Sequence, residues 1–459
     1  MRHILLSIGL LATMSAHATV GNDTTAMTAW DCVRYAVSHS HGLRQRELQA
    51  DNAEAMRLQT IGALLPNIGA SVSAQMNFGR AIDPETNTYT NVSTVGTGYG
   101  LSGSMPVFDG MYRLHALRAA RADLLMQKNA LVAERDQLVL ATYQACLEVT
   151  YAKEAKLLAA EKLHDSQRLL QQARVMEEEG LKSPADVAQI QAQQAADALL
   201  LTQQENQEQV ALLKLKEVMG WPGKEELRIT NDELLMTNDE WRMTDDELRI
   251  TNDELLMTND EWSARAVGGS AAQLLQSRYA VESARHNVGM ARAAFYPTLS
   301  ASGGINSSYY RNIDAPSHSS FSRQLKDNLG QWVGVSVSIP IFNRLGNLMA
   351  LRRAKNNLRI AQEQDAAKAD ELEVLRQQAT LDVEANAKEI VQAEAKTEAD
   401  SIAYELIRRQ FAEGLASPLE MQTAATTLLQ SRTALLQKRL TRGLRLLQKR
   451  YYEGQSLVP

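Results

Sequence analysis

Two acidic side chains stand at matching places in the chain. Asp186 follows the five residues Gly-Leu-Lys-Ser-Pro at 180–184, and Glu420 follows Gly-Leu-Ala-Ser-Pro at 414–418. Each acid lies three residues after a serine, the spacing of a helix capping box, in which the serine and the acid bond each other's backbone N–H groups. The carboxylates could therefore cap helices, and capping would not prevent them from presenting negative charge to cations.

The chain shows no comparable pattern for catalysis or metal binding. It has no Gly-rich phosphate loop, no nucleophile with an identifiable base and no Cys-x-x-Cys pair. Its two cysteines, Cys32 and Cys146, are too few for a disulfide framework. His39 and His41, near a predicted helix start, are expected at the surface rather than as metal ligands. We therefore predict neither an enzyme nor a bound cofactor or metal.

Charge and the first residues point to an exported protein. The 459 residues carry 48 Lys and Arg against 54 Asp and Glu, a net charge of -6, which argues against nucleic acid as a partner. An apolar run from Ile4 to Met14 ends near Ala16-His17-Ala18, which predicts a signal peptide over 1–18. No later segment approaches the roughly 20 apolar residues of a membrane helix, whereas membrane strands remain allowed.

The elements that position the two acids occur twice. Four prolines of the first half are matched in order by four of the second half at offsets between 231 and 234 residues. The residues beside them agree as well. The matched pairs are Pro66 with Pro297, Pro84 with Pro316, Pro106 with Pro340, and Pro184 with Pro418. We predict a first repeat over 19–222 and a second over 264–459, each with a helix, two strands and a long helical hairpin.

The predicted strands alternate between apolar and polar residues. Ile68 to Phe78 is apolar at even positions and rich in Ser, Asn and Gly at odd ones, and Val333 to Ile341 alternates in the same way. Thr97 to Val107 and Thr298 to Tyr310 alternate more weakly. A soluble sandwich would alternate in the same way, but four strands of about 10 residues with Gly- and Ser-rich polar faces and an export signal favour an outer-membrane sheet. Residues 79–96 and 311–330 are expected to form long external loops.

The predicted helices are unusually long. Met111 to Glu179 and Asn347 to Glu413 contain neither Gly nor Pro, so each could run for roughly 100 Å. Leucine and then alanine recur every seventh residue, which predicts closer packing towards one end. These positions are Leu117, Leu124, Leu131, Leu138, Ala145, Ala152 and Ala159. Two shorter helices, Asp31 to Ala63 and Ala185 to Gly220, are expected to line the first long helix.

An acidic insert separates the repeats. Within the insert, 223–263, the fifteen residues Leu227 to Trp241 recur as Leu248 to Trp262, and threonine marks a seven-residue period. Its role stays open between a low-complexity expansion in the equatorial region and a specific contact with an adaptor or the cell wall.

With these features the chain resembles the TolC-type outer-membrane efflux family. The resemblance rests on the duplicated strand entries at Leu65-Pro66 and Tyr296-Pro297, the strand exits at 106–109 and 340–343, and the two Gly-Leu-x-Ser-Pro turns. It implies an α+β homotrimer in which four strands per chain contribute to one β-barrel in the outer-membrane lipid, extended into the periplasm by a helical tube. The tube would dock on a periplasmic adaptor and an inner-membrane pump.

The resemblance also implies a periplasmic entrance or gate at the helix turns. Asp186 matches a linking acid and Glu420 an entrance acid, whereas Thr423 replaces a second acid and Ala416 a basic linking residue. Phe411 occupies an aromatic linking position without a hydroxyl group. The tips expected to touch the adaptor are Gly180, Leu181, Ser183, Gly414, Leu415 and Ser417.

The function expected is a passive duct of a tripartite efflux or type I secretion system. The alternative is a periplasmic adaptor or helical scaffold, which would show one hairpin and compact β domains.

Overall fold

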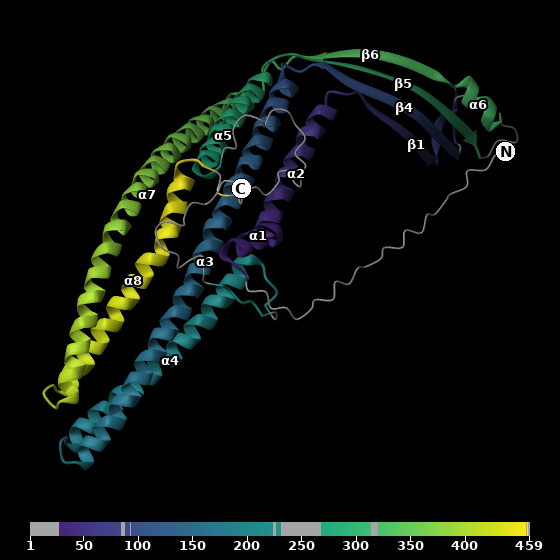
Figure 1. The fold of residues 1–459 in the computed structure, drawn as a ribbon. Helices are drawn as coiled ribbons and strands as arrows, with labels where there is room; N and C mark the ends of the chain where they lie inside the picture. The colour runs from purple at the N-terminus through teal and green to yellow at the C-terminus, as the bar shows by residue number, and fades with distance from the viewer. Residues whose placement is uncertain are drawn as a thin grey trace, which may run out of the picture. The chain divides into compact units, whose positions relative to one another are not determined.

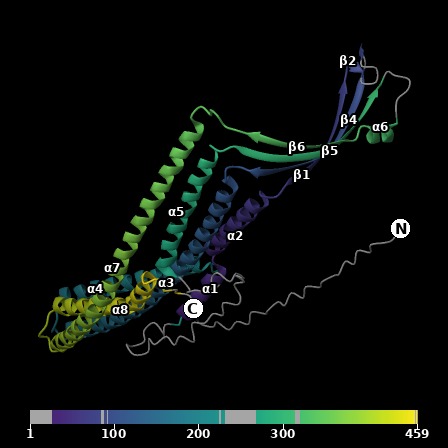
Figure 2. The same ribbon diagram turned by 90° about the horizontal axis from the view of Figure 1, so that it is seen from above.

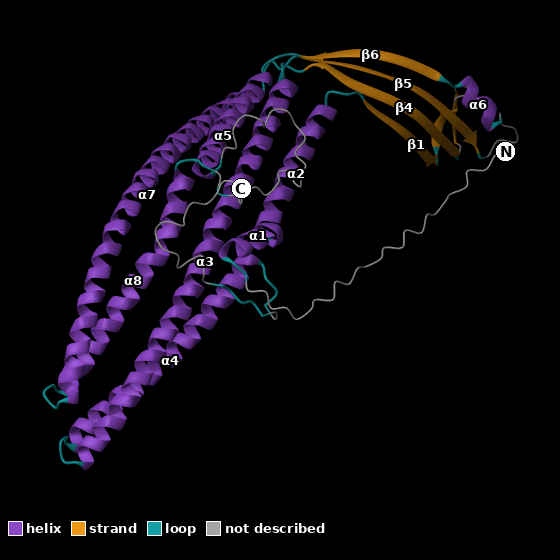
Figure 3. Cartoon of the chain, viewed as in Figure 1, coloured by secondary structure: helices purple, strands orange, loops and turns teal. Residues whose placement is uncertain are grey.

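The computed structural model describes residues 27–83, 88–91, 93–223, 226–230, 268–313, 320–455 and 457. The predicted signal peptide and most of the predicted insert lie outside these residues. The described chain is mainly helical, with one four-stranded and one two-stranded antiparallel sheet, as the α+β prediction requires (Figure 3). The residue boundaries of the two repeats stay a prediction.

The chain forms two compact units, each built from three separate stretches. The hairpin-end unit contains the described residues of Met1–Ala36, Thr142–Trp241 and Tyr404–Leu429. The sheet unit contains those of Val37–Ala141, Arg242–Ala403 and Gln430–Pro459.

The two long helices form where the sequence predicts them. Helix α3 (Tyr112–Glu178) and helix α7 (Gly346–Ala412) each contain 67 residues. In the hairpin-end unit, the predicted alanine positions Ala145, Ala152 and Ala159 are buried, which fits close helix packing. The remaining helices are α1 (Ala29–His39), α2 (His41–Gly62), α4 (Pro184–Met219), α5 (Gly269–Ala293), α6 (Phe321–Asp327) and α8 (Pro418–Tyr452).

The predicted helix from Asp31 to Ala63 is wrong as a single element. It is divided into α1 and α2 at Ser40, whose backbone is extended (φ -62°, ψ 124°). The Ser40 side chain accepts a hydrogen bond from Leu43 N at 3.4 Å and so caps the start of α2. A serine that bonds the backbone in this way competes with helix continuation.

Four strands of the sheet unit lie side by side in the order β1-β4-β5-β6 (Figure 1; Figure 2 shows them from above). They are β1 (Asn67–Asn77), β4 (Thr94–Phe108), β5 (Thr298–Asn312) and β6 (Gly330–Ser338). The first repeat supplies β1 and β4, and the second supplies β5 and β6. The central pair, β4 with β5, therefore joins the two repeats.

The register keeps the predicted alternation across all four strands. Pairs on one face are mostly apolar, such as Ala70 with Leu101, Leu101 with Ile305, and Leu299 with Val337. Pairs on the other face are small or polar, such as Ser71 with Gly100 and Ser300 with Ser336. The sheet thus has one apolar face and one Ser- and Gly-rich face.

The predicted external loops contain structure that the sequence analysis missed. Within 79–96, a hairpin pairs β2 (Arg80–Asp83) with β3 (Thr88–Asn91), and the Arg80 guanidinium lies 5.4 Å from the centre of the Tyr89 ring. Within 311–330, helix α6 is held to β5. The Gln324 side chain donates to Tyr310 O and accepts from Tyr310 N, both at 2.9 Å. One amide side chain therefore replaces the strand partner that β5 lacks there.

Candidate functional site

The α3–α4 and α7–α8 turns have the same backbone construction, and both belong to the hairpin-end unit. Gly180 has φ 75° and Gly414 has φ 76°, a left-handed conformation that favours glycine. After Gly180, Leu181 N donates to Met176 O at 2.8 Å, and after Gly414, Leu415 N donates to Gln410 O at 2.8 Å. These bonds close each long helix with a Schellman motif.

A capping box then opens each following helix. Asp186 N donates to Ser183 Oγ at 3.2 Å, and Ser183 N donates to Asp186 Oδ2 at 3.1 Å. In the second turn, Glu420 N donates to Ser417 Oγ at 3.2 Å, and Ser417 N donates to Glu420 Oε2 at 2.7 Å. Both acids are therefore capping residues, one of the two roles that their spacing allows.

The capping bonds also favour the charged form of each acid. The hydrogen bonds donated by the Ser183 side chain and backbone lower the pKa of Asp186. Those donated by the Ser417 backbone and side chain lower the pKa of Glu420. A carboxylate that accepts such bonds stays ionised more readily, so each turn holds a fixed negative charge.

Two leucines project from the turns. Leu181 is 66% exposed and Leu415 is 74% exposed, so neither is buried against its own hairpin in the single chain. The glycine before each leucine and the serine two residues after it are exposed as well. The large exposed apolar side chain of the first tip is thus Leu181, and those of the second are Leu415 and Leu419, which is 59% exposed.

Phe411, Ala416 and Thr423 have different surroundings. Phe411 is 2% exposed and packs in a core with Leu170, Val187 and Met421. The Lys182 ammonium lies 4.5 Å from the centre of the Phe411 ring, a cation–π contact between the two turns. Ala416 is buried in the same core. Thr423 is exposed, and its hydroxyl donates to Leu419 O at 2.8 Å.

A buried polar network, which the sequence analysis missed, links the two hairpins. Lys162 Nζ of α3 lies 3.2 Å from Asp197 Oδ1 of α4, and it donates to Thr426 Oγ1 of α8 at 3.3 Å. Gln193 of α4 donates to Asp197 Oδ1 at 2.7 Å and accepts a hydrogen bond from Gln422 of α8. The i,i+4 spacing of Gln193 and Asp197 is the one local signal in the sequence that could have indicated this polar network.

A second link joins α7 to α3. Tyr404 Oη donates to Asp165 Oδ2 at 3.5 Å. Burial, followed by the charge of Asp165, raises the pKa of Tyr404 to about 12, so the phenol keeps its proton at neutral pH. Both repeats therefore contribute polar side chains to one connected packing region.

Among the described residues, no group of three or more His, Cys, Asp and Glu side chains is arranged to hold an ion. His39 and His41 are both exposed, as predicted.

No helix in the described part of the chain is both long and apolar enough to cross a membrane.

The family model for outer membrane efflux proteins matches residues 33–221 and 268–447, which is most of the chain. The chain belongs to the outer membrane efflux protein family. It is therefore an outer-membrane efflux protein and not an enzyme. The TolC-type resemblance is thereby confirmed.

Several solved structures share the fold. CusC is 18% identical with a TM-score of 0.76, over 94% of this chain and 93% of CusC. VceC from Vibrio cholerae is 17% identical with a TM-score of 0.75, over 93% of this chain and 96% of VceC. The Campylobacter jejuni channel CmeC is 17% identical with a TM-score of 0.75, over 93% of this chain and 85% of CmeC. A search of curated proteins found no match.

Proposed function

We propose that this efflux protein is a passive export duct that works as a homotrimer in the outer membrane. Each chain contributes four strands to a shared β-barrel, and the hairpins extend into the periplasm. There they dock on a periplasmic adaptor and an inner-membrane pump of a tripartite efflux or type I secretion system. The pump supplies the energy.

The unpaired edges of the sheet carry this proposal. Among the described strands, β1 pairs with β4 alone, and β6 pairs with β5 alone. One edge of β1 and one edge of β6 thus expose backbone N–H and C=O groups. Lipid cannot bond these groups, so a membrane sheet must close on itself. Pairing of β1 with β6 of a neighbouring copy would close it, and the family resemblance makes the number of copies three.

The apolar face supports placement in lipid. Val333 is 90% exposed, Val72 73% and Ile68 68%. A large exposed apolar surface of this kind marks a contact with lipid or with another protein. Contact with acyl chains would remove this area from water, while the Ser- and Gly-rich face would line the aqueous passage. One sheet then separates lipid from water.

The two turns suit the periplasmic entrance. Asp186 and Glu420 hold fixed negative charge there, and symmetry would repeat each charge in every copy. Rings of like charge in a narrow opening attract cations. Thr423 and Phe411 belong to the same predicted entrance. Phe411 would contribute by packing in the core beneath the turns. The exposed Leu181 and Leu415 would provide apolar contacts for the helical tips of the adaptor.

Assembly is tested by native mass spectrometry of protein gently extracted from the outer membrane in detergent. The expected mass is that of three chains. A monomer mass, or recovery as soluble periplasmic protein, contradicts the proposal.

Docking is tested with a photo-crosslinking amino acid at single positions in cells. Position 181 or 415 should capture the adaptor. Position 199 is the control, because Leu199 is 60% exposed but lies within α4, away from the turn. Equal capture of the adaptor from 181 and 199 would show that the tips are not the docking site.

A further inference from the structure

The only two cysteines of the chain meet in the folded protein. Cys32 of α1 and Cys146 of α3 are 114 positions apart in the sequence, and both side chains are 0% exposed. Both are free thiols in the structure, and a hydrogen bond joins the Cys146 thiol to Cys32. In a chain of 459 residues with two cysteines, this contact places every sulfhydryl group at one point.

Aromatic contacts fix α1 at this point within the hairpin-end unit. The ring centres of Trp30, two residues before Cys32, and Tyr143, three residues before Cys146, are 6.0 Å apart. The Tyr35 and Trp221 ring centres are 4.6 Å apart, which ties the middle of α1 to the residues after α4. Ring contacts before and after Cys32 in the sequence therefore hold α1 against α3 and against the residues after α4.

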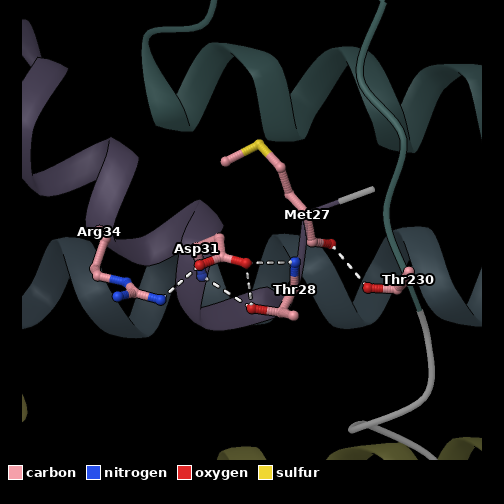
Figure 4. A network of polar contacts seen from close by, with 5 residues as sticks. All are labelled: Met27, Thr28, Asp31, Arg34 and Thr230. Atoms are coloured by element: carbon pink, nitrogen blue, oxygen red, sulfur yellow. Dashed lines mark hydrogen bonds and ion pairs between the residues drawn. The ribbon is translucent and has the colours of Figure 1, made fainter. Parts of the chain in front are cut away.

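Polar contacts fix the first turn of α1 as well (Figure 4). Asp31 accepts hydrogen bonds from Thr28 N at 3.0 Å and from Arg34 at 2.5 Å. Met27 O accepts a hydrogen bond from Thr230 N at 3.0 Å, so the segment that leads into α1 is joined to the chain after α4. Cys32 lies one residue after Asp31 on this capped turn. Its contact with Cys146 is part of an ordered structure.

The compartment decides what two adjacent thiols become. An outer-membrane protein crosses the periplasm, where disulfides form and persist. We propose that Cys32 and Cys146 form a disulfide in the exported protein, which covalently ties α1 to α3. The inference requires export into the periplasm, and it requires neither trimer assembly nor docking on an adaptor.

The oxidant is a periplasmic thiol–disulfide oxidoreductase in its disulfide form. The thiolate of one cysteine attacks an enzyme sulfur and forms a mixed disulfide, and the enzyme's other sulfur leaves as a thiolate. The second cysteine thiolate then attacks the substrate sulfur of the mixed disulfide and releases the enzyme. Two protons leave the cysteines, and two electrons reduce the enzyme to its dithiol.

The surroundings of the pair determine when this exchange takes place. The hydrogen bond with Cys32 and burial both raise the pKa of the Cys146 thiol. The thiolate is the form that exchanges, so the folded, reduced pair is inert. Oxidation must precede or accompany the packing of α1 on α3. Once formed, the bond is shielded from reductants by the same burial.

The oxidation state is measured on the full chain, exported by its own leader and extracted from the outer membrane. The protein is denatured and alkylated without reductant, then digested with trypsin. The expected product is a single linked species that joins the peptide ending at Arg34 to the peptide 136–153, with neither cysteine alkylated. Recovery of both peptides as separate alkylated species overturns the proposal.

Gel mobility gives a second measurement that does not depend on the stability of variants. A denatured chain with a closed loop is more compact. Without reductant, the wild-type chain should therefore migrate faster than Cys32→Ser. With reductant, the two chains should migrate equally. Cys146→Ser should migrate like Cys32→Ser under both conditions. If the mobility of wild-type chain does not change with reductant, no disulfide is present, even if the variants fold poorly.

Discussion

The imidazole rings of His115 on α3 and His286 on α5 contact each other, with their Nδ1 atoms 3.4 Å apart. The two helices come from different repeats, and both histidines belong to the sheet unit. The charged groups around His286 are Glu282 and Arg285 on its own helix and Arg118 on α3. Two facing imidazoles can share one proton, but they repel each other when both are charged.

This contact predicts a stability that falls in mild acid. Burial, followed by the charge of His115, lowers the pKa of His286. Between that lowered pKa and the unfolded value of about 6.5, the unfolded chain binds more protons than the folded one. The free energy of unfolding should therefore fall as the pH drops through about 6.5.

The measurement is the midpoint temperature of thermal unfolding at about pH 7.5 and about pH 5.5, on either side of the pKa of histidine in the unfolded chain. His286→Asn should reduce the difference between the two midpoints, and His41→Asn, at an exposed histidine, should not. An equal difference in wild type and His286→Asn would mean that the stability change comes from other groups.

Gly289 provides a steric test of the same contact. A Cβ atom at Gly289 would lie 2.5 Å from His115 Nδ1 and 2.6 Å from His115 Cγ, so the ring would have to move. The steric cost of Gly289→Ala should be about 1–3 kcal/mol. Alanine is more favourable than glycine in a helix by roughly 0.5–1 kcal/mol. The steric cost is the larger of the two, so the variant should be less stable than wild type.

The matched control is Gly62→Ala in α2, where a Cβ would meet no atom within 4 Å. This variant should be at least as stable as wild type. The midpoints of chemical unfolding compare the two variants, and equal effects would show that His115 moves without cost.

The buried ion pair of the hairpin-end unit should be strongly sensitive to the loss of one partner. The Lys162 and Asp197 side chains are 13% and 3% exposed. Lys162→Met would leave the Asp197 carboxylate buried without its cation, at a cost of about 3–5 kcal/mol. Adding Asp197→Leu should recover much of this loss. Chemical unfolding of the two variants and wild type measures both effects.

Lys214→Met is the control for that series. Lys214 pairs with Glu148 at 2.7 Å, but the two side chains are 55% and 37% exposed, so the loss should be no more than about 1 kcal/mol. If Lys162→Met costs as little as Lys214→Met, the network does not hold the hairpins together.

Local signals predicted the features that local physics determines. Period-two alternation predicted the strand faces, and prolines such as Pro66 and Pro297 marked the strand entries. The absence of Gly and Pro predicted α3 and α7, and Gly180 with Ser183 predicted the turn geometry. Each of these depends on residues within a few positions of one another.

Contacts between distant segments were not predictable in the same way. The pairs Cys32 with Cys146 and His115 with His286 are separated by more than a hundred residues, and no periodicity relates their positions.

The division of the predicted helix at Ser40 was missed for another reason. Its flanks continue a helical pattern, so the capping serine was the sole sign of a boundary.

Glu420→Gln separates charge from capping at the second turn. The Glu420 carboxylate accepts hydrogen bonds from Ser417 N at 2.7 Å and Ser417 Oγ at 2.9 Å through one oxygen, Oε2. A glutamine carbonyl oxygen can accept the same bonds. Because these bonds lower the pKa of Glu420, the wild-type residue stays charged through neutral pH, and its contribution is lost as the pH falls through that lowered pKa.

Planar-bilayer recordings should show weaker cation selectivity for Glu420→Gln. The difference should be largest at low salt, because the Debye length shortens to about 8 Å at physiological ionic strength. Ser417→Ala is the complementary control, since it keeps the charge and removes the serine cap, at a cost of about 1 kcal/mol in stability. It should leave selectivity unchanged. If Glu420→Gln lowers stability while its selectivity equals that of wild type, Glu420 is a capping residue and contributes no charge ring to the entrance.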